Sequence, residues 1–233
     1  MDKNGNSYTF IYATVMVVLV AALLAVAAVS LKPAQTKNAE IEKKQNILKS
    51  INVAADALTA EDVFAKTITE MYVVNSKGEK AEGSAFDIDL KVEHSKPIEE
   101  RRLPVYVANL GDQGVKYILP LRGTGLWGPI WGYMALNEDA NTIYGASFDH
   151  QGETPGLGAE INTEWFQKPF IGKTIFDNNG TLTSIIIAKA GEKAAPEHSV
   201  DAISGGTITS KALQQMLWDD LSVYQEFLKT LKK

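Results

Sequence analysis

The stretch "PVYVANLGDQGVKYILPL", Pro104 to Leu121, holds the clearest strand signals in the chain. "PVYVAN" and "VKYILPL" are rich in β-branched and aromatic residues, and the turn sequence "GDQG" separates them. Similar segments are "MYVVN", "AFDIDLKVE", "NTIYGASF" and "SIIIAK", separated by turns such as "SKG", "NEDAN" and "DNNG". Because no long helical pattern alternates with these strands, the sequence predicts an α+β fold with a mainly antiparallel sheet and packed helices.

One of these segments, "AFDIDLKVE", shows strict alternation of apolar and polar residues. Its apolar positions are Phe86, Ile88, Leu90 and Val92. A period of two is typical of a strand with one buried and one solvated face. We therefore expect this segment to belong to the sheet.

Helical patterns lie on both sides of the predicted strands. Apolar residues from Ala39 to Lys66 are spaced by threes, fours and sevens, with a break near Asn52 to Thr59. This predicts one or two helices in a connector at residues 33–70, followed by the sheet domain at residues 71–233. A last helix is expected from about Lys211, with one apolar stripe formed by Leu213, Met216, Leu217, Leu221, Tyr224, Phe227, Leu228 and Leu231.

The N-terminal region is strongly apolar, since Phe10 to Leu31 contains no charged residue. A helix of this length covers about 33 Å, which is enough for a hydrocarbon core of about 30 Å. Residues 1–32 are therefore predicted to form a short tail and a transmembrane anchor. A cleavable signal peptide is the alternative, because "AVAAVS" has suitably small residues, but the apolar run is long and only Lys3 precedes it.

The charges around the anchor leave its orientation open. Lys32, Lys37, Lys43 and Lys44 follow the apolar run, and the positive-inside rule would keep the following domain in the cytoplasm. That rule weakens when a long domain follows the span.

The overall composition excludes several classes of function. The chain has 233 residues and a formal net charge of -5, so no basic nucleic-acid-binding surface is predicted. It contains no cysteine, which excludes disulfides, thiolate metal sites and a cysteine nucleophile. Its three histidines are scattered, so we expect no metal site.

A first glycine-marked stretch is "GTGLWGPIWGY", Gly123 to Tyr133. Its glycines and Pro129 indicate a bend that carries two large aromatic residues, Trp127 and Trp131. The bend could place both tryptophans in the core. Alternatively, it could form an aromatic wall for a planar ligand or a partner in the membrane.

A second stretch is "HQGETPGLGAE", His150 to Glu160. Pro155 followed by Gly156 predicts a type II turn, and Thr154 before the proline should be extended. This turn is either a plain hairpin loop or a loop that presents Glu153, Thr154 and Leu157 to a ligand.

A third stretch is "DAISGGTITS", Asp201 to Ser210. Gly205 and Gly206 leave space beside Thr207, and Ser210 is expected to cap the following helix. Because helix N-termini suit phosphate, the stretch predicts a phosphate or ester site. The alternative is a glycine-rich turn into a capped helix, and the pattern is not that of a P-loop.

Together, these stretches resemble the C subunits of the Na⁺-translocating NADH:quinone reductases. The similarity is densest from "LPVYVANLGD" through "GTGLWGPIWGY" and "NTIYGASFDHQGETPGLGAEI" to "HSVDAISGGTITS". The flavin-attachment pattern of that family is Asp, two residues, Ser or Thr, Gly, Ala, Thr. Here it corresponds to Asp201, Ser204, Gly205, Gly206 and Thr207, with glycine at position 206 in place of the usual alanine.

The resemblance implies a covalent flavoprotein. A flavin transferase would move FMN from FAD onto the hydroxyl of Thr207 as a phosphoester, with Thr209 as the alternative attachment residue. The protein would then carry single electrons from an iron–sulfur centre at the membrane subunits to another covalent FMN in a neighbouring subunit. It would be a single-pass protein of the bacterial inner membrane with its domain in the periplasm, in contact with the bilayer and other subunits.

The resemblance and the residue types also suggest further FMN-binding residues. Ser204, Thr209 and Ser210 could hydrogen-bond phosphate or ribityl oxygens, Trp127 and Leu157 could cover the ring, and Glu153 and Thr154 could reach its polar edge. Lys189 could favour a reduced anion by Coulomb attraction. Gly156 and Gly205 shape the loops, and Asp201 is expected to be a recognition element for the transferase or a turn-forming residue rather than a catalyst. No acid–base or nucleophilic constellation is found, so the chain is expected to lack a complete active site of its own.

Two alternative functions remain. The related Rnf electron-transport complex has a G subunit with the same anchor, flavin domain and attachment motif. A membrane-tethered binding or scaffold domain without a cofactor is the alternative from another class.

Overall fold

A computed structural model describes residues 5–232. The chain divides into two compact units, with the boundary between Lys43 and Lys44. Helix α1 (Asn6–Ser50) contributes to both units, and within the described residues it is the one helix long and apolar enough to cross a membrane. Length and composition therefore agree with the predicted anchor.

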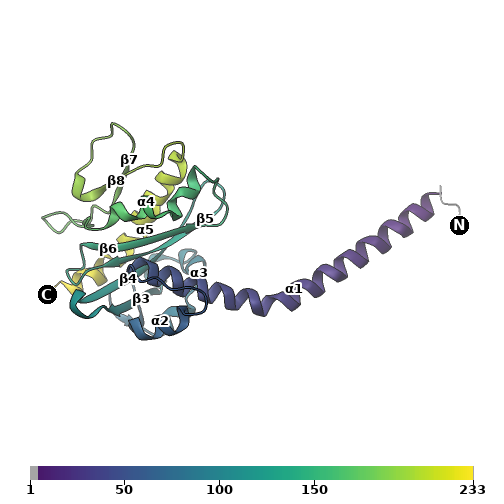
Figure 1. The fold of residues 1–233 in the computed structure, drawn as a ribbon, viewed down its shortest axis with the longest axis horizontal. Coiled ribbons are helices and arrows are strands. Elements are labelled where there is room, and N and C mark those ends of the chain that lie inside the picture. The colour runs from purple at the N-terminus through teal and green to yellow at the C-terminus, as the bar shows by residue number, and fades with distance from the viewer. Residues whose placement is uncertain (1–4, 233) are drawn as a thin grey trace. The chain divides into compact units, whose positions relative to one another are not determined.

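The second unit is built on a six-stranded antiparallel sheet with the order β2-β1-β3-β4-β5-β6 (Figure 1). Its strands are β1 (Ile68–Val74), β2 (Lys80–Ala81), β3 (Leu103–Asn109), β4 (Val115–Thr124), β5 (Pro129–Leu136) and β6 (Ile143–His150). The stretch from Pro104 to Leu121 forms the β3–β4 hairpin, in which Tyr106 faces Ile118. The predicted α+β fold with an antiparallel sheet is confirmed.

The sheet is buried on both faces because its apolar residues point in both directions. In β3, Val105 and Val107 belong to one hydrophobic core, while Tyr106 and Ala108 belong to the other. The first core contains the long helix α5 (Thr207–Leu231), and the second contains the last turns of α1 and helix α2 (Ala60–Thr67). The break between these two helices falls where the sequence predicts it, between Asn52 and Thr59.

Helix α5 packs on the sheet through the predicted apolar stripe. Seven of the stripe residues are buried, and Leu231 packs partly against the same core. The hydroxyl of Tyr224 donates to the carbonyl of Pro104 over 2.7 Å, which ties the helix to β3. The helix begins at Thr207 rather than near Lys211, one turn earlier than expected.

The segment "AFDIDLKVE" is not a strand, so this prediction was wrong. It forms a 3₁₀ turn at Ala85–Asp87 and helix α3 (Leu90–His94). The carboxylate of Asp89 accepts the N–H of Lys91 and caps α3, while Val92 is 49% exposed. The apolar alternation therefore does not mark one face of a sheet, because the local cap starts a helix instead.

The remaining elements lie after β6. They include helix α4 (Glu164–Gln167) and the short strands β7 (Ile186–Ala188) and β8 (Ser199–Asp201). "SIIIAK" thus contains a strand, but β7 pairs in parallel with β8 in a separate two-stranded sheet. This small sheet leads directly into the loop before α5.

Candidate functional site

The three glycine-marked stretches meet at the buried carboxylate of Glu153. One of its oxygens accepts the backbone N–H of Trp127 over 2.9 Å, and the other accepts the hydroxyl of Thr209 over 2.6 Å. The β4–β5 hairpin, the loop after β6 and the start of α5 are therefore joined by one side chain. Sequence reasoning selected Glu153 as a ligand contact but did not foresee this connection.

The first stretch is a tight hairpin between β4 and β5. The N–H of Gly125 donates to the carbonyl of Gly128 over 2.7 Å, and Trp127 at its tip is 68% exposed. Trp127 is therefore not a core residue, whereas Trp131 on β5 is half-buried. A Cβ at Gly125 would lie 2.5 Å from Oε1 of Glu153, so a glycine is needed for this close approach.

The second stretch contains the predicted turn. The N–H of Leu157 donates to the carbonyl of Thr154 over 3.1 Å, and Gly156 has φ +74°, as a type II turn requires. Thr154 and Leu157 at the two ends of this turn are both exposed. The turn therefore presents an apolar side chain and a hydroxyl beside the third stretch.

The third stretch begins α5 without a side-chain cap. Gly206 is the N-cap residue, and its carbonyl accepts the N–H of Ser210 over 2.9 Å. Within the described residues, the backbone N–H groups of Thr207, Ile208 and Thr209 have no hydrogen-bond acceptor. These donors and the helix dipole make a favourable place for an anion.

Ser210 does not cap this helix, so that prediction was wrong. It lies inside α5, is fully buried, and its Oγ accepts the N–H of Ile203 over 3.1 Å. The serine thus fixes the preceding loop onto the helix. Thr207 occupies the first helical position and is half-buried, while Ser204 and Asp201 are exposed.

The second and third stretches are in direct contact. A Cβ at Gly205 would lie 2.7 Å from Cδ2 of Leu157, so the leucine covers the glycine loop. Lys189 is exposed just after β7, and the neighbouring carbonyl of Ala188 accepts the N–H of Ala202 over 2.8 Å. Leu157 and the residues around Lys189 therefore both adjoin the loop that leads to Thr207.

Two further residues of the site were missed by sequence reasoning. A Cβ at Gly158 would overlap Oγ1 of Thr209 and Oε2 of Glu153. His150 accepts the N–H of Glu153 at Nδ1 over 3.2 Å, and its Nε2 is buried without a partner in the described structure. Gly158 was the available signal, since it marks a close approach of backbone and side chains, whereas Gly152 and Gly156 have open space at their Cβ positions.

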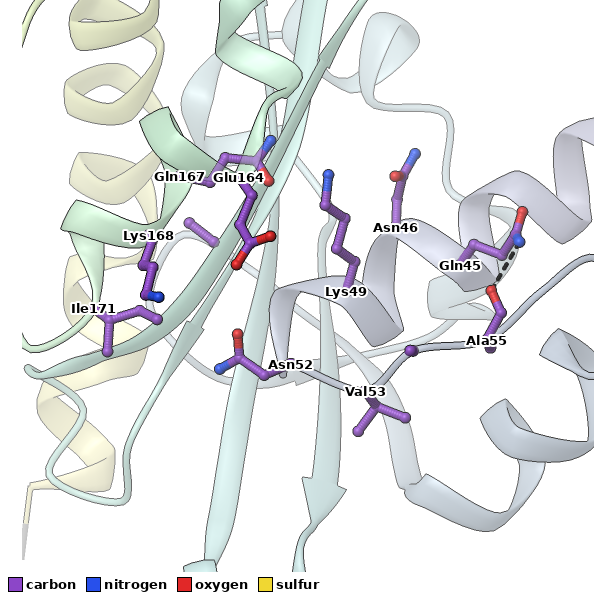
Figure 2. Close-up of a pocket in the computed structure, with 12 residues that line it drawn as sticks. Gln45, Asn46, Lys49, Asn52, Val53, Ala55, Glu164, Gln167, Lys168 and Ile171 are labelled. Atoms are coloured by element: carbon purple, nitrogen blue, oxygen red, sulfur yellow. Dashed lines mark hydrogen bonds between the residues drawn. The ribbon is translucent and has the colours of Figure 1, made fainter.

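A hollow of the second unit lies away from this site, between the end of α1 and the α4 region (Figure 2). It measures about 690 Å³ and includes Lys49, Asn52, Glu164 and Lys168 in its lining, but none of the predicted FMN-binding residues. Size alone therefore does not identify the site. Residues 5–232 contain no cluster of three metal-ligating side chains.

Comparison with known proteins gives a matching family and several relatives. The family described as FMN-binding domain matches residues 125–222, a range that includes Glu153 and Thr207. The C subunit of the Na⁺-translocating NADH-quinone reductase of Neisseria meningitidis serogroup A is 32% identical, covering 99% of this chain and 96% of that protein. The corresponding protein of Vibrio vulnificus is 31% identical, covering 82% and 81%.

Two solved structures are also similar. The C subunit of the same reductase from Parabacteroides distasonis is 47% identical with a TM-score of 0.79, covering 85% of this chain and 96% of that one. NqrC from Shewanella oneidensis is 26% identical with a TM-score of 0.71, covering 85% and 99%.

Proposed function

This chain belongs to the NqrC family, the C subunits of the Na⁺-translocating NADH-quinone reductases, and from that membership we propose that it is a covalent flavoprotein. In this proposal, FMN is esterified through its phosphate to the hydroxyl of Thr207. The matching FMN-binding domain supports a flavin over a cofactor-free scaffold. The named relatives favour the quinone reductase over the Rnf complex.

The observation that carries the proposal is the uncapped start of α5. Thr207 places its Oγ1 at the first helical position, beside backbone N–H groups that lack acceptors among the described residues. A phosphate ester on that oxygen would receive these donors and the positive end of the dipole of a 25-residue helix. The residues present therefore fit a phosphate-linked cofactor.

The surroundings of Thr207 fit a flavin attached by its phosphate. Leu157 and Trp127 are exposed apolar side chains on the two neighbouring loops, and they could cover a planar ring. Thr154 can contribute a hydroxyl, and the ammonium of Lys189 would stabilise negative charge on a reduced ring by Coulomb attraction. When bound, FMN would supply the capacity to accept and release electrons one at a time.

Glu153 and Thr209 have a positioning role in this proposal. Their side chains hydrogen-bond to each other, and Glu153 also holds the N–H of Trp127. They would fix the loops that contact the flavin. Ser204 remains available for the phosphate or ribityl chain because it is exposed and no hydrogen bond of its hydroxyl is present in the described structure.

The membrane and the partner subunits complete the proposal. α1 would anchor the protein as a single span, with the FMN-binding domain on the periplasmic side, and the partners would be other subunits of the reductase. A flavin transferase would load the cofactor. A covalent link would also prevent loss of FMN from a domain outside the cytoplasm.

The test is co-expression of the full chain with a flavin transferase, followed by denaturing gel fluorescence and peptide mass mapping. Wild type should give a fluorescent band with FMN on the peptide that contains Thr207. Thr207→Ala should abolish the band, and Thr154→Ala, at an exposed threonine of the same site, should keep it. FMN mapped to another residue, or a fluorescent Thr207→Ala band, would contradict the proposal.

A further inference from the structure

A second feature of the FMN-binding region is a basic groove between α3, the end of β4 and α5. It consists of two adjoining hollows of about 640 and 460 Å³, which share His94, Arg122, Gly123 and Thr124. The smaller hollow is also lined by Lys91, Gly128, Pro129 and Gln151. Its described lining thus contains two permanent cations and a histidine but no carboxylate.

The two cations of the smaller hollow are not neutralised within the protein. No hydrogen bond or ion pair of the Lys91 ammonium or the Arg122 guanidinium exists in the described structure, residues 5–232. Like charges brought to one hollow repel each other, and an anion between them removes that repulsion. The net charge of the whole chain is -5, so the positive charge of this hollow is local and opposite in sign to that of the chain.

The buried carboxylate of Asp220 fixes the backbone of Arg122. One oxygen of Asp220 accepts the backbone N–H of Arg122 over 2.7 Å, and the other lies 2.8 Å from Nε2 of His94. Asp220 is buried, and its two oxygens are occupied by these partners. It therefore holds β4 and α3 together and leaves the guanidinium of Arg122 for a ligand.

We propose that the smaller hollow of this groove, whose lining lacks the Asp219 carboxylate present in the larger one, binds a phosphate group. Arg122 provides planar paired donors that match phosphate oxygens, and Lys91 adds a second charge. Thr124 and Gln151 add neutral donors at the same hollow. The phosphate could come from a soluble phosphate ester or from a phospholipid headgroup, which share this chemistry.

The separate hollow shown in Figure 2 can be compared with the basic groove. It also has two lysines, Lys49 and Lys168, but Glu164 lies in the same lining. The ammonium of Lys49 donates to the carbonyl of Asn162 over 3.1 Å. Its positive charge is therefore partly balanced by groups of the protein, and we expect no phosphate site in this hollow.

The basic groove is separate from the proposed attachment site at Thr207. Its lining includes none of residues 153–158 and 201–210. On α5 its lining begins at Ala212, five positions after Thr207, which corresponds to about 7.5 Å of helix rise. Binding in the groove does not require the flavin, so its test is independent of the proposed function.

The test uses the full chain in phosphatidylcholine nanodiscs. Binding of inorganic phosphate is measured by calorimetry at constant ionic strength. Wild type should bind phosphate saturably. Arg122→Gln and Lys91→Gln should each weaken binding by about tenfold, as expected for loss of one charge-assisted contact. Lys49→Gln, which removes the same charge at the other hollow, should bind like wild type.

The source of the phosphate is distinguished by nanodiscs that also contain phosphatidylglycerol. A weaker apparent affinity for inorganic phosphate in these discs, absent in Arg122→Gln, would assign the groove to a lipid headgroup, and an unchanged affinity would assign it to a soluble ester. Absence of saturable binding by wild type, equal binding by Arg122→Gln, or loss of binding in Lys49→Gln would overturn the proposal.

Discussion

The hydroxyl of Thr209 donates a 2.6 Å hydrogen bond to the carboxylate of Glu153, 56 positions earlier in the chain. Both residues are buried, and the second oxygen of the carboxylate holds the N–H of Trp127. The loops that approach Thr207 therefore share one buried polar centre. Hydrogen bonds to a buried charge are strong, and leaving such a group unpaired is costly.

The first prediction concerns this bond. Thr209→Val keeps the shape of the side chain but leaves one oxygen of Glu153 without its donor. We expect the free energy of unfolding to fall by about 1–3 kcal/mol, measured by denaturant titration. Thr230→Val on the same helix is the control, because its hydroxyl bonds the carbonyl of Phe227 at an exposed position and should change stability little. Equal effects of both variants would contradict the special role of Glu153.

The second prediction concerns the contact between Leu157 and Gly205. Gly205 has φ +75°, so Gly205→Ala introduces left-handed strain of about 1–2 kcal/mol and a Cβ that overlaps Leu157. Gly180→Ala is a matched control, because Gly180 has φ +78° and open space around its Cβ position. Gly205→Ala should therefore destabilise the protein more than Gly180→Ala in thermal unfolding. Similar losses would show that backbone strain alone is measured.

Sequence reasoning predicted the sheet and α5 because both carry regular apolar patterns. The β3–β4 hairpin combines two β-rich runs with a glycine turn, and the stripe from Leu213 to Leu231 has a helical period. The start of α5 was misplaced because its first turn adds no residue to the apolar stripe: Thr207, Thr209 and Ser210 carry hydroxyls, and Ile208 is 59% exposed. In "AFDIDLKVE", the cap at Asp89 outweighed a period-two pattern.

The candidate site was only partly predictable for a different reason. Its glycines and hydroxyl residues could be recognised locally, and the turn at Pro155–Gly156 follows from local backbone preferences. The bond between Glu153 and Thr209 depends on tertiary packing, which brings the loop after β6 against the first turn of α5. The basic groove is equally non-local, because Lys91, Arg122 and Gln151 come from separate elements.

The third prediction concerns pH. Glu93 is buried, which alone would raise the pKa of its carboxyl, but hydrogen bonds from Lys96 and from the backbone and side chain of Arg102 together lower that pKa below its usual 4.5. Glu93 then contributes stability that is fully present above about pH 4.5 and is lost as pH falls through the lowered, folded-state pKa.

Glu93→Gln tests this dependence. At neutral pH it should reduce the free energy of unfolding by about 1–3 kcal/mol, and the difference from wild type should shrink as pH falls below about 4.5. Glu99→Gln, at an exposed position of the adjacent 3₁₀ turn, is the control and should follow wild type. A difference that stays constant down to pH 2 would show that Glu93 acts through packing rather than through its charge.

The last prediction concerns the proposed flavin ring and rests on attachment at Thr207. Leu157 is 41% exposed beside the attachment loop, so Leu157→Ala should leave FMN attached but uncover one side of the ring. More water contact should shift the flavin absorption and its midpoint potential, measured by spectroscopic redox titration. Ile171→Ala is the control, because Ile171 is 46% exposed but lines the other hollow. If both variants match wild type in spectrum and potential, Leu157 does not contact the ring.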